Sequence, residues 1–211
     1  MKTAVITGGA NGIGNALAHL LVSSYDLHVL DRVEANVGTT HITDVSSLTS
    51  VESALSSVDS VELVILCAGV MRRGTMFESS ESDFDLLYSV NVKGYWTVLK
   101  ALSERLAENA TVLFISSRHA SVLPIDPALY ALTKRANADM AILLSQTRPD
   151  LIVKTAFLGP VETAISKEGV SEQDFILKRQ IAISPGECAE LLFSFLCSHE
   201  STLTYKDGKY V

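Results

Sequence analysis

The stretch from residue 4 to residue 21, AVITGGANGIGNALAHLL, changes character twice. It opens with a short apolar run, and such a run before a glycine-rich segment predicts a β-strand. Leu17, Leu20 and Leu21 recur at helical spacing and predict an amphipathic helix. Glycines fill the interval between the two. The stretch therefore predicts a strand, a glycine turn and a helix in succession.

The glycine turn contains Gly8, Gly12 and Gly14. Glycine permits positive φ and lets a ligand approach the backbone, while the free N–H groups that open a helix can bind phosphate oxygens. The spacing does not fit the general dinucleotide pattern G-x-G-x-x-G. On this loop alone, a phosphate site and an ordinary tight turn between strand and helix both remain open.

Composition limits the classes of protein to consider. With 211 residues, 47% of them hydrophobic, the chain is long enough for one domain with a sizeable core, and we expect a single domain over residues 1–211. A formal net charge of -7 argues against a nucleic-acid partner or an anionic membrane surface, since either needs a basic face. No apolar run approaches the roughly 20 residues of a membrane span, and no signal-peptide pattern opens the chain. We therefore expect no membrane association and a cytoplasmic location.

The three cysteines, Cys67, Cys188 and Cys197, are odd in number and lack the spacing of metal ligands. Their apolar neighbours predict buried, reduced thiols. We expect neither a disulfide nor a metal site.

Apolar runs alternate with helical patterns along the whole chain. Further strands are predicted at 27–30, 41–43, 61–67, 111–115, 151–157 and within 201–211. Helices are predicted at 46–57, over a long stretch that starts within 80–83 and continues to 102, from 127 after an Asp126 cap, and at 185–195. Such alternation predicts an α/β fold, a doubly wound parallel sheet with helices on both faces. Ligands of these sheets bind at the carboxyl ends of the strands.

Two residues of the helix that follows Asp126 stand out. Tyr130 and Lys134 are four positions apart and so share one helix face, and Ser117 ends the preceding strand thirteen positions before Tyr130. Each of these residues has an ordinary structural explanation when it is taken alone. Tyr130 can be a half-buried aromatic, Lys134 a solvated helix residue and Ser117 a strand-end cap. In this order, after Thr-Gly-x-x-x-Gly-Ile-Gly, they resemble the short-chain dehydrogenase/reductase family, specifically its single-domain, NAD(P)-dependent members with a Rossmann-type fold.

The resemblance implies an oxidoreductase that interconverts a secondary alcohol and a ketone. Tyr130 is expected to act as acid and base, Ser117 to hold the substrate oxygen, and Asn91 to distort its helix and hold a water. Lys134 is expected to lower the pKa of the Tyr130 phenol and to bind the nicotinamide ribose. The alternatives are a catalytically weak dinucleotide-binding sensor or regulator of the same fold and, less favoured, a structural partner protein.

Asp31 ends the second strand, where its carboxylate would accept hydrogen bonds from the adenosine ribose and repel a 2′-phosphate. This favours NAD(H), while Arg32 leaves NADP(H) open. Two departures from the family pattern are Leu66-Cys67, in place of an Asn-Asn pair, and Leu158, in place of proline. The candidate cofactor-binding residues are Gly8, Asn11, Gly12, Ile13, Gly14, Asp31, Arg32, Asp44, Val45, Ala68, Gly69, Asn91, Tyr130, Lys134, Gly159, Val161 and Thr163.

The substrate is expected to be a small alcohol or carbonyl compound. The segment 162–183 is predicted to be a substrate lid, with a plain pair of surface helices as the alternative. Candidates to line the substrate pocket are Met71, His119, Ser121, Leu123 and Leu158. The resemblance also implies a homodimer or homotetramer, packed through the helices that contain Asn91 and Tyr130 at alanine-rich faces.

Overall fold

The computed structural model describes residues 1–167, 169 and 180–211. In this part of the chain eight strands form one sheet in the order β3-β2-β1-β4-β5-β6-β7-β8. All neighbours are parallel except β7 and β8, which form an antiparallel hairpin. The strands are β1 (Lys2–Thr7), β2 (Tyr25–Asp31), β3 (Thr39–Ile42), β4 (Val61–Leu66), β5 (Leu106–Ser117), β6 (Ile152–Leu158), β7 (Thr202–Lys206) and β8 (Lys209–Tyr210).

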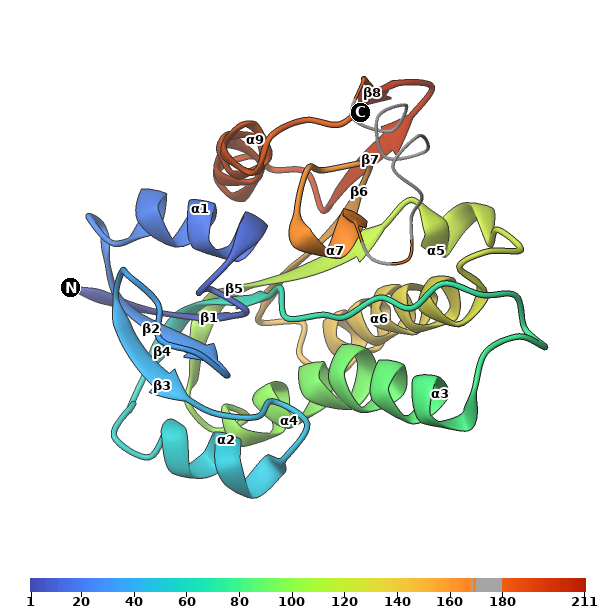
Figure 1. Ribbon diagram of the computed structural model, residues 1–211. Helices are drawn as coiled ribbons and strands as arrows, with labels where there is room; N and C mark the ends of the chain where they lie inside the picture. The colour runs from blue at the N-terminus through green and yellow to red at the C-terminus, as the bar shows by residue number, and fades with distance from the viewer. Residues whose placement is uncertain (168, 170–179) are drawn as a thin grey trace.

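Helices cover both faces of the sheet, as Figure 1 shows. Helices α1 (Gly12–Leu21) and α9 (Pro185–Cys197) lie on one face, and α2 (Leu48–Ala54), α4 (Gly94–Ala101) and α6 (Ala128–Thr147) lie on the other. The shorter elements are α3 (Glu81–Tyr88), the π-helical turn η1 (Ser89–Lys93), α5 (His119–Val122) and α7 (Ala164–Lys167). The predicted doubly wound, Rossmann-type fold is confirmed.

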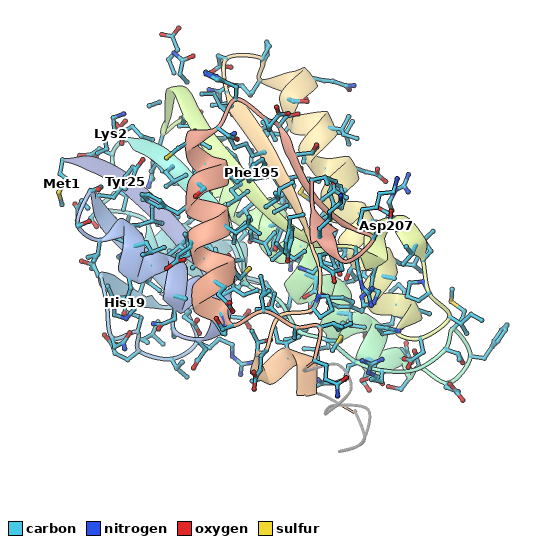
Figure 2. The ribbon with its side chains drawn as sticks, turned by 90° about the horizontal axis from the view of Figure 1, so that it is seen from above. Met1, Lys2, His19, Tyr25, Phe195 and Asp207 are labelled. Atoms are coloured by element: carbon cyan, nitrogen blue, oxygen red, sulfur yellow. The ribbon has the colours of Figure 1, made fainter. Side chains whose placement is uncertain are left out.

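The central strands are buried on both sides. Ile6 of β1 packs in one apolar cluster with residues of α1 and α9, whereas its neighbour Val5 packs in the other with residues of α2 and α4. Figure 2 shows α9 crossing the sheet with Phe195 near its end. Because β1 pairs with β2 on one side and β4 on the other, the chain reverses its direction of winding there, and ligands bind at such a switch point.

The start of α6 differs from the prediction. We expected Asp126 to cap a helix beginning at Pro127, but Pro127 is itself the extended N-cap residue and the helix begins at Ala128. The Asp126 carboxylate instead accepts a hydrogen bond from the Gly74 backbone N–H at 2.8 Å and pairs with Arg73 Nη1 at 3.2 Å. A long-range partner has replaced the local cap.

The cysteines also depart from expectation. All three are free, but only Cys188 is fully buried, whereas Cys67 is partly exposed and Cys197 is exposed. The short α9–β7 connection places Cys197 at the surface end of its helix. The prediction of three buried thiols is therefore wrong for Cys197.

None of the described helices is long and apolar enough to cross a membrane. Among the residues that the structure describes, no group of three or more His, Cys, Asp or Glu side chains is placed to hold a metal ion. The cytoplasmic location stays a prediction.

Candidate active site

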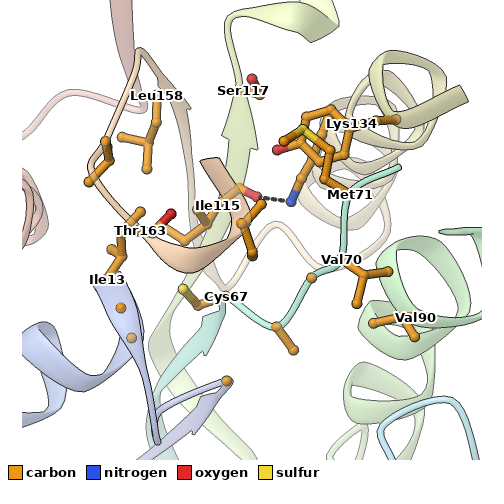
Figure 3. A pocket seen from close by; sticks show the side chains of 18 of the residues that line it. Ile13, Cys67, Val70, Met71, Val90, Ile115, Ser117, Lys134, Leu158 and Thr163 are labelled. Atoms are coloured by element: carbon orange, nitrogen blue, oxygen red, sulfur yellow. Dashed lines mark hydrogen bonds between the residues drawn. The ribbon is translucent and has the colours of Figure 1, made fainter. Parts of the chain in front are cut away.

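A cavity of about 660 Å³ opens at the carboxyl ends of the central strands. Figure 3 shows side chains that line it, with Cys67 between Ile13 on one side and Val70 on the other. Of the predicted site residues, those lining the cavity are Gly8, Asn11, Gly12, Ile13, Gly14, Asp31, Arg32, Asp44, Val45, Ala68, Gly69, Ser117, Tyr130, Lys134, Gly159, Val161 and Thr163. Of the predicted catalytic and cofactor-binding residues, Asn91 alone does not line it. Residues chosen from distant parts of the sequence therefore share one space.

The glycine turn needs its glycines for two different reasons. Gly8 has φ of +70°, and a Cβ there would lie 2.8 Å from the Cα of Ala68. A Cβ on Gly14 would lie 2.2 Å from the Gly8 carbonyl oxygen. Helix α1 carries no acidic side chain in its first turn, so its free N–H groups and positive dipole end face the cavity without a competing carboxylate. These features fit the pyrophosphate of a dinucleotide.

The Asp31 carboxylate supports the same turn. One oxygen accepts a hydrogen bond from the Ala10 N–H at 3.0 Å, and the other accepts one from the Arg32 N–H at 2.7 Å. The Val33 N–H also donates to Asp31 at 3.4 Å, and because a carboxylate has about four acceptor sites, about one remains for a ribose hydroxyl. Asp31 thus fixes the glycine turn and keeps the capacity to bind a sugar.

Asp44 lies beside this ribose end of the cavity. Hydrogen bonds from the Ser46 hydroxyl at 2.7 Å and the Ser46 backbone N–H at 2.9 Å lower the pKa of the Asp44 carboxyl. The residue is therefore an anion at neutral pH. Val45 follows it as an apolar wall.

Hydrogen bonds to a side chain of β1 fix the backbone at the end of β4. The Thr7 hydroxyl accepts hydrogen bonds from the backbone N–H groups of Cys67 and Ala68, both at 3.0 Å. This replaces part of the fixation that the family's asparagine pair is expected to give. Burial raises the pKa of the Cys67 thiol to about 11, so this cavity thiol is neutral at physiological pH.

Asn91 lies in the π-helical turn η1, so the implied helix distortion is present. Its side chain is fully buried, with Oδ1 accepting from Val70 N–H at 2.8 Å. The amide nitrogen donates to the Val70 carbonyl at 2.9 Å and to Thr133 Oγ1 at 3.0 Å. Both amide hydrogens are thus engaged with protein atoms, and Asn91 ties the loop after β4 to helix α6. A water-holding role for Asn91 stays a prediction.

Tyr130 lies next to Ser117 at the end of β5. Burial raises the pKa of the Tyr130 phenol to about 12, and a hydrogen bond with the Ser117 side chain offsets part of that rise. The Ser117 hydroxyl also accepts a hydrogen bond from His119 N–H at 3.2 Å. The phenol is therefore protonated at neutral pH.

Lys134 is buried, with only 4% of its surface exposed. Its ammonium nitrogen donates to the Ile115 carbonyl at 3.0 Å, as the dashed line in Figure 3 marks, and lies 5.8 Å from the centre of the Tyr130 ring. Burial lowers the pKa of Lys134 to about 8. Burial raises the pKa of the Tyr130 phenol overall, and the Lys134 ammonium is hydrogen-bonded to the Ile115 carbonyl; that Lys134 lowers the pKa of Tyr130 stays a prediction.

The far wall of the cavity comes from the loop after β6. The Gly159 N–H donates to the Tyr210 hydroxyl at 3.2 Å, and a Cβ on Gly159 would lie 2.5 Å from the Tyr205 ring. Thr163 approaches the glycine turn, with its methyl 3.4 Å from where a Gly12 Cβ would stand. The β7–β8 hairpin therefore supports the loop that faces the glycine turn.

The substrate end is only partly as predicted. Met71, His119 and Leu158 line the cavity, whereas Ser121 and Leu123 do not. Of the predicted lid, Thr163, Ala164, Ile165 and Ile181 line the cavity, while residues 168 and 170–179 lie outside the described residues. The lid stays a prediction.

Sequence reasoning missed three charged residues of the lining, Arg73, Arg118 and Asp126, the last of which was predicted only as a helix cap. Arg118 could have been found, because it directly follows Ser117. Arg73 gave no signal in the sequence, because the pairing with Asp126 that holds its loop is a long-range contact.

The family model, the relatives and the solved structure that resemble this chain are all dehydrogenases or oxidoreductases. Residues 2–174 match the family model for the short chain dehydrogenase. Oxidoreductase UcpA of Escherichia coli (strain K12) is 26% identical over 235 residues, covering 95% of this chain and 89% of that protein. L-rhamnose 1-dehydrogenase (NADP(+)) of Thermoplasma acidophilum is 27% identical over 197 residues, covering 82% and 78%. The X-ray structure of an alcohol dehydrogenase from the archaeon Thermococcus sibiricus, complexed with 5-hydroxy-NADP, has a TM-score of 0.83 at 27% identity, covering 97% and 96%.

Proposed function

The chain belongs to the short-chain dehydrogenase family of oxidoreductases, and from that premise we propose that it interconverts a secondary alcohol and a ketone with a nicotinamide dinucleotide. One observation carries the proposal: Ser117, Tyr130 and Lys134 line the same cavity as the glycine turn. A protein that only bound the dinucleotide would have no need of the first two residues. The site residues predicted from the sequence are the proposed machinery.

The chemistry divides between cofactor and protein. A bound nicotinamide supplies or accepts the hydride. Tyr130 gives a proton to the carbonyl oxygen in reduction, or takes one from the alcohol in oxidation. The Ser117 hydroxyl donates a hydrogen bond to that oxygen and stabilises its developing charge. Lys134 and Tyr130 share the proton supply, with the Lys134 ammonium also able to donate to the ribose.

The pKa values favour the reductive direction near neutral pH. A phenol whose pKa is raised to about 12 stays protonated and can act as an acid. Lys134, with a pKa lowered to about 8, is mostly protonated at pH 7 and can replace the proton. We therefore propose reduction of a carbonyl compound as the direction that these groups serve best.

For the cofactor we propose NAD(H), on the strength of Asp31. Its carboxylate is fixed by Ala10 N–H and Arg32 N–H at the cavity edge, where a 2′-phosphate would meet its charge. Arg32 also lines the cavity and could pair with such a phosphate. The names of the Thermoplasma and Thermococcus relatives both refer to NADP, so NADP(H) is the alternative to test.

The test is Tyr130→Phe, which removes the hydroxyl and keeps the ring. We expect NADH binding, followed by nicotinamide fluorescence, to change less than about threefold, while kcat falls by about 10²–10⁴-fold with a substrate found by screening. Because NADH and NADPH can be titrated without knowing the substrate, that titration comes first. Normal turnover by Tyr130→Phe would remove the mechanism.

A dinucleotide-binding sensor is the second candidate, favoured by Leu66-Cys67 in place of the family's asparagine pair. In that case NADH binds tightly, but no alcohol or carbonyl compound is turned over by either wild type or Tyr130→Phe. The same two measurements therefore separate the two functions.

We propose a homodimer for the assembly. A surface groove between α3, η1, α4 and α6 includes Trp96 and Met140, and Trp96 is 47% exposed. The expected alanine faces support this contact only weakly, because Ala131, Ala138 and Ala141 are buried within the chain, while Ala128 and Ala136 are partly exposed. Exposed Trp96, Ile142 and Leu143 are the stronger support.

A further inference from the structure

The substrate end of the cavity is richer in arginine than the proposed reaction requires. Arg73 and Arg118 both line it, with Asp126 as the carboxylate among the described lining residues at that end. The other two lining carboxylates, Asp31 and Asp44, follow β2 and β3. Strand β2 is three positions from β5 in the sheet, about 14 Å at the usual strand spacing. They therefore serve the ribose end and do not balance these arginines.

The arginines are incompletely paired. The Asp126 carboxylate is engaged by Gly74 N–H at 2.8 Å and Arg73 Nη1 at 3.2 Å. The Nε of Arg73 is buried without a hydrogen-bond partner. The Arg118 guanidinium makes no ion pair with any described residue. Arginine residues in a cavity wall that have donors to spare are common receptors of carboxylates, which accept two parallel N–H bonds from one guanidinium.

The position of Arg118 restricts where the anion can be. Arg118 directly follows Ser117, so their Cα atoms are about 3.8 Å apart. Ser117 is the residue proposed to hold the reacting oxygen. An acidic group on the substrate that binds Arg118 therefore lies within the reach of one arginine side chain from the backbone of Ser117, which a short substrate can span. Met71 and Leu158 supply apolar surface for the short carbon chain between.

We infer that the substrate is a short oxo acid or hydroxy acid, whose carboxylate binds Arg118 with support from Arg73. This rests on the proposed function and adds the class of substrate to it. The inference distinguishes the chain from its relative named for L-rhamnose, which is an uncharged sugar. A small second ligand also fits a cavity of about 660 Å³ that has to hold a dinucleotide as well.

The experiment compares short 2-oxo and 3-oxo acids with their own methyl esters, and L-rhamnose as an uncharged alcohol. Turnover is measured with the preferred cofactor, and binding is measured on the Tyr130→Phe–NADH complex by nicotinamide fluorescence. We expect at least one acid to have a kcat/KM at least about tenfold above that of its ester. Arg118→Gln should raise KM for the acid by at least about tenfold and leave the ester within twofold. Arg118→Lys keeps the positive charge but cannot donate two parallel N–H bonds to a carboxylate. Its KM for the acid should therefore lie between the values for wild type and Arg118→Gln.

Arg148→Gln is the matched control, because Arg148 follows the far end of α6 and pairs with Asp150. It should leave the acid and ester values unchanged. Three results would each overturn the inference. The esters or the sugar could be turned over as well as the acids, Arg118→Gln could raise KM equally for acid and ester, or no acid could be bound or turned over. Failure of both NADH and NADPH to bind would instead overturn the proposed function, so the two failures are distinguishable.

Discussion

Lys134 and Tyr130 are buried side by side, and burial moves the pKa of each towards its neutral form. The pKa of Lys134 falls from 10.5 to about 8, and that of Tyr130 rises from 10.0 to about 12. Without a charged partner, a buried ammonium costs stability. Burying these groups therefore lowers the free energy of unfolding. Such shifted pKa values are common at sites where titratable groups take part in chemistry.

Lys134 should give the stability a measurable pH dependence. Below pH 8 the lysine is protonated in both states, and the burial cost is present in full. Between pH 8 and 10.5 this lysine binds more protons in the unfolded state, so its contribution to stability rises with pH. The contribution of Lys134 to the free energy of unfolding in urea should rise by roughly 1 kcal/mol between pH 8 and 9, whereas the raised pKa values of the Cys67 and Cys188 thiols lower the total in the same range. The contribution is measured, without added cofactor, as the difference between wild type and Lys134→Met. A difference that stays constant across this range would contradict the assignment.

A substitution at Asp31 can separate the effect of its negative charge on cofactor preference from the effect of its hydrogen bond to the glycine turn. Asp31→Asn keeps an oxygen that can accept from Ala10 N–H, which Asp31 now does at 3.0 Å, but removes the negative charge. If the charge excludes a 2′-phosphate, the ratio of the Kd for NADPH to the Kd for NADH should fall by about tenfold or more. Fluorescence titration with both nucleotides measures it. An unchanged ratio would assign the preference to Arg32.

At the scale of elements, the parts that could be predicted from the sequence are those with local signals. The glycine turn, the strand before Ser117 and the shared face of Tyr130 and Lys134 depend on spacing alone. Asp126 was misread because an acid before a helix usually caps it, whereas here the carboxylate binds Gly74 N–H in a distant loop. The hydrogen bonds of Asn91, and the position of Arg73, likewise depend on contacts that no short stretch encodes.

The β7–β8 hairpin makes a further element-scale prediction. The Tyr210 hydroxyl accepts the Gly159 N–H at 3.2 Å and so helps to fix the loop that carries Val161 and Thr163. Tyr210→Phe keeps the ring packed against Tyr205 and removes only the acceptor. We expect the Kd for NADH to rise about three- to tenfold, with little loss of thermal stability, because a net hydrogen bond contributes about 1 kcal/mol. Unaltered NADH affinity would show that the hairpin does not position this loop.

At the scale of the whole molecule, the face formed by α4 and α6 lies opposite α1 and α9 in Figure 1. Its exposed apolar side chains, Trp96, Ile142 and Leu143, are 47%, 56% and 62% exposed. Aromatic residues that stay exposed in one chain are typical of the centre of a protein–protein interface. We propose that two copies meet at this face.

Trp96→Glu should therefore convert a dimer into a monomer. A carboxylate at the centre of an apolar contact would be desolvated without a partner, at a cost of several kcal/mol. Light scattering at micromolar concentration should give twice the chain mass for the wild type and the single-chain mass for Trp96→Glu. Phe77→Glu is the control, since Phe77 is 98% exposed in the loop after β4 and does not line the groove. NADH binding should persist in both variants, because neither residue lines the cavity; a monomeric wild type, or dissociation by Phe77→Glu instead, would place the interface elsewhere.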